Sequence, residues 1–145
     1  MHIETVTHLT GEIFEAVQRL VPLLGAHKPK PSWDDLDLLI DSDTSILLVA
    51  RYPAPDSPIV GMLTIALYRV PTGIRSIVED VVVDTEYRNK GIAKALMRSA
   101  IEIARLAGAN GVSLTSNPQR EAANQLYISL GFQKRETNAY FFPLQ

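Results

Sequence analysis

The chain has 145 residues, 46% of them hydrophobic, and a formal net charge of −2, which together fit one globular domain with a core of ordinary size. This small negative charge argues against nucleic acid as the main partner, because neutralising phosphates requires a basic face. The absence of cysteine excludes disulfides and thiol catalysis, and no apolar run is long enough to cross a membrane.

Residues 1–10 mix charged and polar side chains, and no signal-peptide pattern occurs there. Together with the absence of cysteine, this favours a cytoplasmic location and no membrane partner. The three histidines, His2, His8 and His27, lack the spacing of metal ligands, so no metal site is expected.

The amino-terminal third predicts a short strand and two helices. Residues 3–7 alternate apolar and polar side chains, as a half-buried strand does. Thr10 is placed to cap a helix that runs to about residue 24. Ser32 is placed to cap a second helix, which has acidic residues in its first turn.

Three strands are predicted in the middle of the chain. Residues 46–52 and 59–70 are apolar runs, the second with Gly61 at a position typical of a bulge. Residues 77–83, with the sequence IVEDVVV, form a β-branched run that is typical of a strand buried on both faces. A polar turn at residues 84–87 ends this strand.

The segment after this turn predicts an anion site. Residues 88–93, with the sequence RNKGIA, are basic and open a helix whose apolar positions recur at helical spacing. A helix N-terminus presents unpaired N–H groups and the positive end of the helix dipole, so it suits a phosphate. Gly91 lets a ligand approach the main chain closely. The alternative is an ordinary, solvated start of a basic helix.

The carboxy-terminal part completes a mixed α/β fold with one layered sheet. A glycine-rich stop and a short strand occupy residues 107–115. Asn117 is placed to cap the last helix, with a proline at its first position, and Gly131 ends it. Residues 132–135 and 138–144 predict a closing antiparallel pair of strands.

Two stretches carry a family resemblance. The pattern Arg88-x-x-Gly91-x-Ala93 after a Glu-Asp-Val-Val-Val strand resembles the pyrophosphate loop of the GNAT superfamily of acyl-CoA N-acyltransferases, Gln/Arg-x-x-Gly-x-Gly/Ala. Residues 117–132, with their Leu-Tyr and Leu-Gly-Phe landmarks, resemble that family's carboxy-terminal helix-to-strand segment. The resemblance implies that residues 1–145 form a single GNAT N-acetyltransferase domain, with a mostly antiparallel central sheet and about four flanking helices.

The resemblance also implies acetyl-CoA as co-substrate, without a metal. The pyrophosphate would bind the loop residues, which are Arg88, Asn89, Lys90, Gly91, Ile92 and Ala93. The pantetheine arm would pair with main-chain groups of Val81 and Val83, and the N–H of Val81 is the family's usual donor to the thioester carbonyl. The cofactor-facing side of the last helix would carry Asn117, Arg120 and Asn124, and many family members have Asn where Arg120 stands.

Glu79 is the candidate base that deprotonates the acceptor ammonium. It precedes Val81 by two residues, which predicts that both side chains lie on one face of the strand. Because a carboxylate is a weak base for an ammonium, two alternatives stay open: a water relays the proton, or Glu79 only orients the substrate. Asp80 would point to the opposite face unless a bulge shifts the register.

Tyr127 occupies the family's general-acid position. A phenol, with a reference pKa of about 10, is a weaker acid than a thiol at about 8.5, so a hydrogen bond to the leaving sulfur is the safer assignment. The alternative is a helix aromatic whose hydroxyl lies at the surface.

The function implied by the resemblance is transfer of an acetyl group from acetyl-CoA to a primary amine, by direct attack in a ternary complex. A small metabolite amine is the expected acceptor. The alternatives are a protein N-terminus or lysine, and a non-catalytic acyl-CoA-binding or sensing module. The acceptor pocket is expected from residues 24–42 and 70–76, with Trp33 either in its wall or anchoring a core. Acyl-chain preference and oligomeric state, a homodimer included, stay open.

Overall fold

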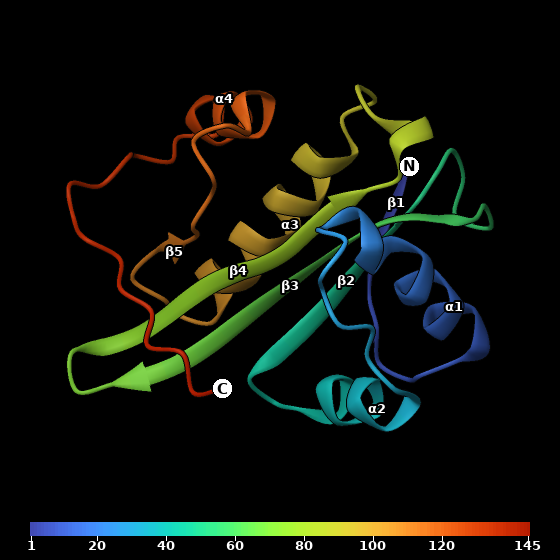
Figure 1. Ribbon diagram of the computed structural model, residues 1–145, viewed down its shortest axis with the longest axis horizontal. Coiled ribbons are helices and arrows are strands. Elements are labelled where there is room, and N and C mark those ends of the chain that lie inside the picture. The colour runs from blue at the N-terminus through green and yellow to red at the C-terminus, as the bar shows by residue number, and fades with distance from the viewer. The chain divides into compact units, whose positions relative to one another are not determined.

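The computed structural model describes all residues from 1 to 145, which form two compact units, Met1–Leu114 and Thr115–Gln145 (Figure 1). The larger unit contains one five-stranded sheet with the strand order β1-β2-β3-β4-β5. Its first four strands pair in antiparallel fashion, and β5 runs parallel to β4. The strands are β1 (His2–Thr5), β2 (Ser45–Arg51), β3 (Ile59–Val70), β4 (Gly73–Val83) and β5 (Val112–Ser113). The mostly antiparallel sheet predicted from the sequence is thus confirmed.

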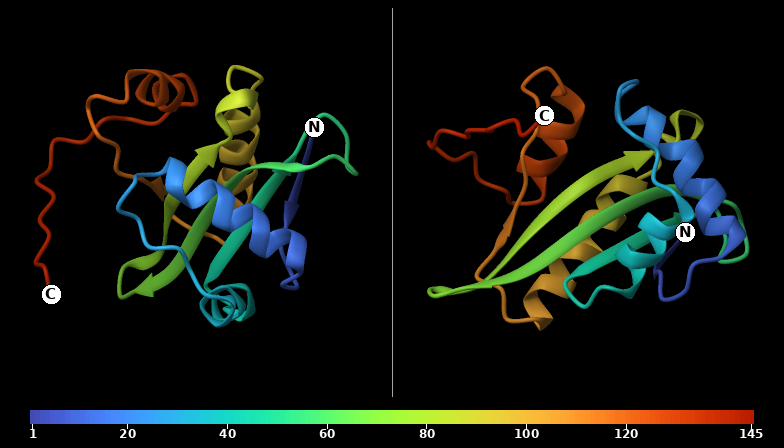
Figure 2. Two further views of the ribbon diagram at one scale, coloured as in Figure 1. Left: turned by 45° about the vertical axis from the view of Figure 1, so that its right-hand side comes forward. Right: turned by 60° about the horizontal axis from the view of Figure 1, so that its bottom comes forward.

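The helices of the larger unit lie on both faces of this sheet. Figure 2 shows α1 and α2 on one side and α3 on the other. The elements are α1 (Gly11–Leu20), the 3₁₀ turn η1 (Val21–Leu23), α2 (Trp33–Asp41), the 3₁₀ turn η2 (Thr85–Tyr87) and α3 (Ile92–Leu106). The smaller unit contains α4 (Glu121–Ser129), so the predicted number of helices is confirmed.

Each face of the sheet buries an apolar stripe of a helix. The spacing of the α1 stripe is that of one helix face, and its buried members are Ile13, Ala16, Val17 and Leu20. These side chains belong to one core cluster with sheet residues such as Leu47, Val49, Met62 and Val82. On the other face, α3 buries Leu96, Met97, Ala100 and Ala104. Burial of these side chains supplies most of the driving force for folding.

Side-chain caps start the first two helices where the sequence predicts them. The N–H of Ile13 donates to Thr10 Oγ1 over 3.2 Å, so Thr10 caps α1. Ser32 and Asp35 form a reciprocal capping box at the start of α2, with both bonds 3.1 Å long. The helical path ends close to the predicted residue 24, but its last turn is the 3₁₀ turn η1, because Pro22 lacks the N–H that would continue the α-helical ladder.

Two bulges bend the sheet. In β3, Gly61 pairs with Ala50 and Ile59 with Arg51, so the extra residue lies next to Gly61, as predicted. A Cβ at Gly61 would lie 3.3 Å from atoms of Ile92 and Leu96, so this glycine allows α3 to pack closely against the sheet. In β4, the second bulge contains Asp80, whose φ is +52°.

The predictions for the carboxy-terminal part are wrong in two places. Asn117 does not cap α4, because its Oδ1 accepts from Gln119 N–H (2.9 Å) in a local turn and the helix begins only at Glu121. The strands predicted at residues 132–135 and 138–144 are absent. A Schellman motif with Gly131 at φ +102° ends α4, and residues 133–145 make no backbone–backbone hydrogen bond, without which no strand exists.

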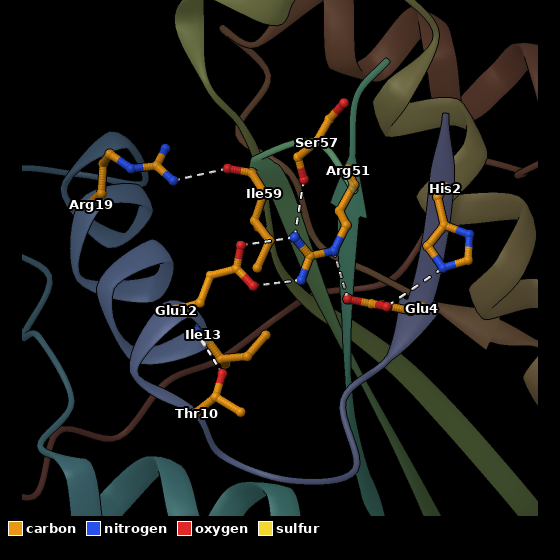
Figure 3. A network of polar contacts seen from close by, with 9 residues as sticks. All are labelled: His2, Glu4, Thr10, Glu12, Ile13, Arg19, Arg51, Ser57 and Ile59. Atoms are coloured by element: carbon orange, nitrogen blue, oxygen red, sulfur yellow. Dashed lines mark hydrogen bonds and ion pairs between the residues drawn. The ribbon is translucent and has the colours of Figure 1, made fainter. Parts of the chain in front are cut away.

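A charged network fastens α1 to the amino-terminal edge of the sheet (Figure 3). Arg51 donates to both carboxylate oxygens of Glu12, over 2.7 and 2.8 Å, and to Glu4 Oε1 over 3.0 Å. The same guanidinium donates to the carbonyl of Ser57 over 3.0 Å. These hydrogen bonds from Arg51 hold the pKa of Glu12 below its ordinary value, and Glu12 in turn raises the pKa of Arg51. The side chain of Arg51 is only 14% exposed, so the network is stronger than a surface ion pair.

We expect Glu12→Gln to lower the free energy of unfolding by about 1 kcal/mol at pH 7. Because the pKa of Glu12 is lowered in the folded state, its carboxylate stabilises the fold above its ordinary pKa, and this contribution is lost as the pH falls through the lowered value. Urea unfolding of both proteins at pH 7 and at about pH 3 measures the difference, which should shrink at the lower pH.

The matched control is Glu102→Gln, which removes an exposed partner of Arg105 on α3 and should change stability little at either pH. A Glu12→Gln effect no larger than this control would contradict the structural role of the network.

Candidate functional site

The segment between β4 and α3 contains two left-handed residues in an exposed basic turn. Asp84 begins η2 by accepting the N–H of Glu86 at its Oδ1 over 3.3 Å. Asn89 and Gly91 then have φ angles of +63° and +79°, and α3 starts directly after Gly91. The αL conformation is ordinary for glycine, and asparagine adopts it more readily than most other residues.

The start of α3 has no side-chain cap. The first helical hydrogen bond is donated by the N–H of Ala95 to the carbonyl of Gly91, over 3.1 Å. The preceding N–H groups, those of Ile92, Ala93 and Lys94, donate to no group of the protein. These donors lie at the positive end of a 15-residue helix, and such a terminus binds anions.

The charges around this turn fit a diphosphate. Arg88, Lys90 and Lys94 are exposed, and none of them forms an ion pair within the chain. A Cβ placed on Gly91 would meet no atom within 4 Å, so the space over the turn is open. Residues 88–94 therefore combine side-chain cations, free N–H donors and open space, which a diphosphate needs.

Tyr52, at the end of β2, lies beneath one of these cations. Lys90 Nζ is 5.7 Å from the centroid of the Tyr52 ring, and the Tyr87 ring meets the same ring edge-on at 6.1 Å. A cation–π contact at an exposed site contributes roughly 0.5–1 kcal/mol. The contact with Tyr52 holds Lys90 at the turn. No local sequence pattern predicts this contact, because the two residues are 38 positions apart in the sequence.

The outer edge of β4 next to this turn has no strand partner. β5 pairs only with Ser76 and Ile77, so the edge of residues 78–83 is open. The N–H of Asp84 donates to the carbonyl of Val60 in β3 over 2.8 Å. Main-chain groups alternate in direction along a strand, and the N–H of Asp84 points to β3, so those of Val83 point to the open side. They are free to pair with an extended polar arm of a ligand.

The bulge in β4 changes the expected place of Glu79. Glu79 pairs with Thr64 and Val82 pairs with Met62, so Glu79 shares a face with Val82 and not with Val81 as predicted. Val82 belongs to the core cluster on the face that carries α1 and α2. Glu79 is therefore an exposed carboxylate on that face, without a hydrogen-bond partner in the chain.

The smaller unit brings two predicted cofactor residues together. The side-chain amide of Asn124 donates to the carbonyl of Asn117 over 3.0 Å, which ties α4 to the turn before it. Arg120 is exposed at the boundary between this turn and α4, where its ψ of 70° lies outside the helical range.

Tyr127 is a buried residue of α4. It is 8% exposed, and its ring packs against Phe132 with centroids 5.9 Å apart. Burial raises the pKa of the Tyr127 hydroxyl above its ordinary value, and the positive charge of Arg120 partly opposes that rise. At neutral pH this phenol is therefore protonated and able to donate a hydrogen bond.

Residues 8–132 match the model of the Acetyltransferase (GNAT) family, and the chain belongs to that family. The family resemblance seen in the sequence is thereby confirmed, and acetyl-CoA is the co-substrate that the family uses.

Several curated relatives match part of the chain. It is similar to N-acetylaspartate synthetase of Danio rerio, with 47% identity over 62 residues, which are 42% of this chain and 22% of that protein. It is also similar to N-acetyltransferase 8F1 of Rattus norvegicus, with 33% identity over 87 residues, 60% of this chain and 34% of that protein. The matched segments thus span only about a fifth to a third of the length of these relatives.

Solved structures share the fold over nearly the whole chain. An aminoglycoside acetyltransferase from an uncultured soil metagenomic sample superposes with a TM-score of 0.85 at 19% identity, covering 99% of this chain and 96% of that one. An acetyltransferase of Trypanosoma brucei gives a TM-score of 0.76 at 26% identity, covering 98% and 100%. At 19% identity, the first likeness shows the fold alone.

No helix combines the length and the apolar character that crossing a bilayer requires. No group of three or more His, Cys, Asp and Glu side chains is arranged to hold a metal ion.

We expect Gly91→Ala to lower the free energy of unfolding by about 1 kcal/mol, because a Cβ is strained at a φ of +79°. Urea denaturation measures the change. Gly11→Ala is the control, since Gly11 has an ordinary φ with nothing near its Cβ position, and it should be neutral or slightly stabilising. Equal stability of the Gly91→Ala variant and the wild type would show that the turn does not require this conformation.

Proposed function

We propose that the protein is an N-acetyltransferase that transfers the acetyl group of acetyl-CoA to a primary amine, by direct attack in a ternary complex. Residues 1–145 act in this proposal as one GNAT domain. The observation that carries it is the uncapped start of α3, where free N–H groups and exposed cations surround the left-handed Gly91. Membership of the GNAT family supports the same reaction.

The chain holds acetyl-CoA, which supplies the activated acetyl thioester, through main-chain groups. The turn from Arg88 to Ala93 binds the diphosphate, and the open edge of β4 at Val81 and Val83 pairs with the pantetheine arm. The N–H of Val81 donates to the thioester carbonyl oxygen as negative charge develops there. Asn117, Arg120 and Asn124 are assigned to the same co-substrate on the basis of the family resemblance.

Glu79 is the residue that we assign to the acceptor amine. Its carboxylate has no partner in the chain and lies on the face of the sheet that carries α1 and α2. A carboxylate there attracts an ammonium and accepts its proton, directly or through a water. If Glu79 only orients the amine, its replacement will weaken amine binding more than it slows turnover.

Tyr127 is the donor that we assign to the leaving sulfur. The raised pKa of its hydroxyl keeps the phenol protonated, which favours a hydrogen bond to the departing thiolate over complete proton transfer. Stabilising the thiolate lowers the barrier to its departure from the acetyl group.

A small amine is the acceptor that we propose. One relative supports this by its name, an N-acetylaspartate synthetase. Trp33 is 45% exposed and rests on Phe14 with ring centroids 5.5 Å apart, so it both packs on α1 and offers an exposed aromatic face. We propose residues 24–42 and 70–76 as the walls of the acceptor site.

A panel of amines tests the proposal directly. The protein is incubated with acetyl-CoA and each of a set of amino acids, polyamines, aminoglycosides and peptides, and the released thiol is detected colorimetrically. Amine-dependent thiol release supports an enzyme, and the best amine identifies the acceptor class. CoA binding without release against any amine would favour a sensing module, and release only with peptides would favour a protein substrate.

We expect Tyr127→Phe to slow turnover by about 10- to 100-fold and to leave the affinity for CoA nearly intact, because only the hydrogen bond to the sulfur is lost. Steady-state kinetics and calorimetry with CoA measure the two effects. Phe132→Leu is the control, since it alters the packing of the same ring without removing the hydroxyl. Turnover at the wild-type rate in Tyr127→Phe would exclude Tyr127 from the chemistry.

We expect Gly91→Glu to abolish CoA binding, because it adds a negative side chain where the diphosphate is proposed to bind. Calorimetry with CoA measures the affinity, and circular dichroism establishes that the variant is folded. Gly11→Glu, which adds the same charge at the start of α1, should bind CoA like the wild type. Unchanged affinity in Gly91→Glu would refute the turn as the diphosphate site.

A further inference from the structure

Arg19, in the last turn of α1, contacts the end of β4. Its Nη1 donates to Asp84 Oδ2 over 3.1 Å, and its Nη2 donates to the carbonyl of Ile59 over 2.8 Å (Figure 3 shows the second contact). Its Nε also donates to Glu15 of the same helix over 3.3 Å. The side chains of Arg19 and Asp84 are 37% and 22% exposed, so this pair is more sheltered than the pair with Glu15, which is 65% exposed.

Asp84 connects the end of β4 to the basic turn through four hydrogen bonds. Its N–H donates to Val60 in β3 over 2.8 Å, and its carbonyl accepts the N–H of Tyr87 over 2.9 Å. Its Oδ1 accepts the N–H of Glu86, and its Oδ2 accepts from Arg19. All four of these contacts meet within one residue, four positions before Arg88, so Asp84 fixes how the chain leaves the sheet.

We propose that Arg19 is a positioning residue for the co-substrate. By holding the Asp84 carboxylate, it fixes the orientation of the turn that presents the N–H groups at the start of α3. The inference rests on the proposed function, since it concerns how strongly that turn binds the diphosphate of CoA. Arg19 itself does not touch the diphosphate in this proposal.

The remaining contacts explain why loss of Arg19 should leave the fold intact. Without the guanidinium, the two main-chain hydrogen bonds of Asp84, to Val60 and from Tyr87, persist, so η2 still forms. The carboxylate would then be free to change rotamer, and its bond to the N–H of Glu86 would compete with water. Donors that must all point at one anion lose affinity when their orientation relaxes, because the ordering is then completed only on binding.

The test uses two ligands that differ in the diphosphate. CoA carries it, and pantetheine consists of the arm and thiol without it. We expect Arg19→Gln to bind CoA about five- to tenfold more weakly than the wild type in calorimetry, and pantetheine with unchanged affinity in an NMR titration. Arg19→Lys, which keeps the charge but reaches fewer acceptors, should recover part of the CoA affinity.

Glu15→Gln is the matched control, because it removes the exposed partner of Arg19 on α1 and leaves the Asp84 contact in place. It should bind CoA like the wild type. If Arg19→Gln does not fold, Asp84→Asn repeats the test, since its amide oxygen can still accept from Glu86 while the ion pair is lost.

Unchanged CoA affinity in Arg19→Gln would overturn the proposal. Equal weakening toward CoA and pantetheine would also overturn it, since that result indicates a general structural defect. Failure of the wild type to bind CoA would instead refute the proposed function, and the role of Arg19 would fall with it.

Discussion

The start of α3 is the constraint on which the proposed chemistry depends. A helix that begins after a left-handed glycine has no capping side chain, so its first N–H groups stay free for a ligand. Such a terminus is less stable than a capped one, and the surrounding contacts compensate. Ile92 is buried against Gly61 in the sheet, which holds the first turn of the helix in place while its donors remain exposed.

The strand β4 leads into the basic turn and also contributes to the proposed co-substrate site. β4 carries both the bulge at Asp80 and the open edge beyond β5, so one strand provides free main-chain groups next to the basic turn. Arg51 and Arg19 connect α1 to the ends of β2, β3 and β4. α1 thus packs against the sheet through its apolar stripe and is also tied to the strand that leads into the turn.

Local patterns in the sequence predicted most of the larger unit. Thr10 and Ser32 were recognisable as caps because capping depends on residues three positions apart, and the β-branched run before Asp84 identified β4. The face of Glu79 was predicted wrongly because the bulge depends on pairing with β3, which no local pattern encodes. The tail after Gly131 was also predicted wrongly, since an apolar segment becomes a strand only when another strand pairs with it. The uncapped helix start at Gly91 was predictable from the basic glycine motif, and its role as a diphosphate site stays a prediction. The contacts of Tyr52 with Lys90 and of Arg19 with Asp84 were not predictable, because 38 and 65 positions separate the partners in the chain.

A backbone-amide NMR titration of the protein with CoA tests the central claim most directly. If main-chain donors at the start of α3 bind the diphosphate, the amide resonances of Ile92, Ala93 and Lys94 will shift the most, and pantetheine will leave them nearly unmoved. Large shifts confined to other parts of the chain, with these three amides unchanged at saturating CoA, would contradict the account.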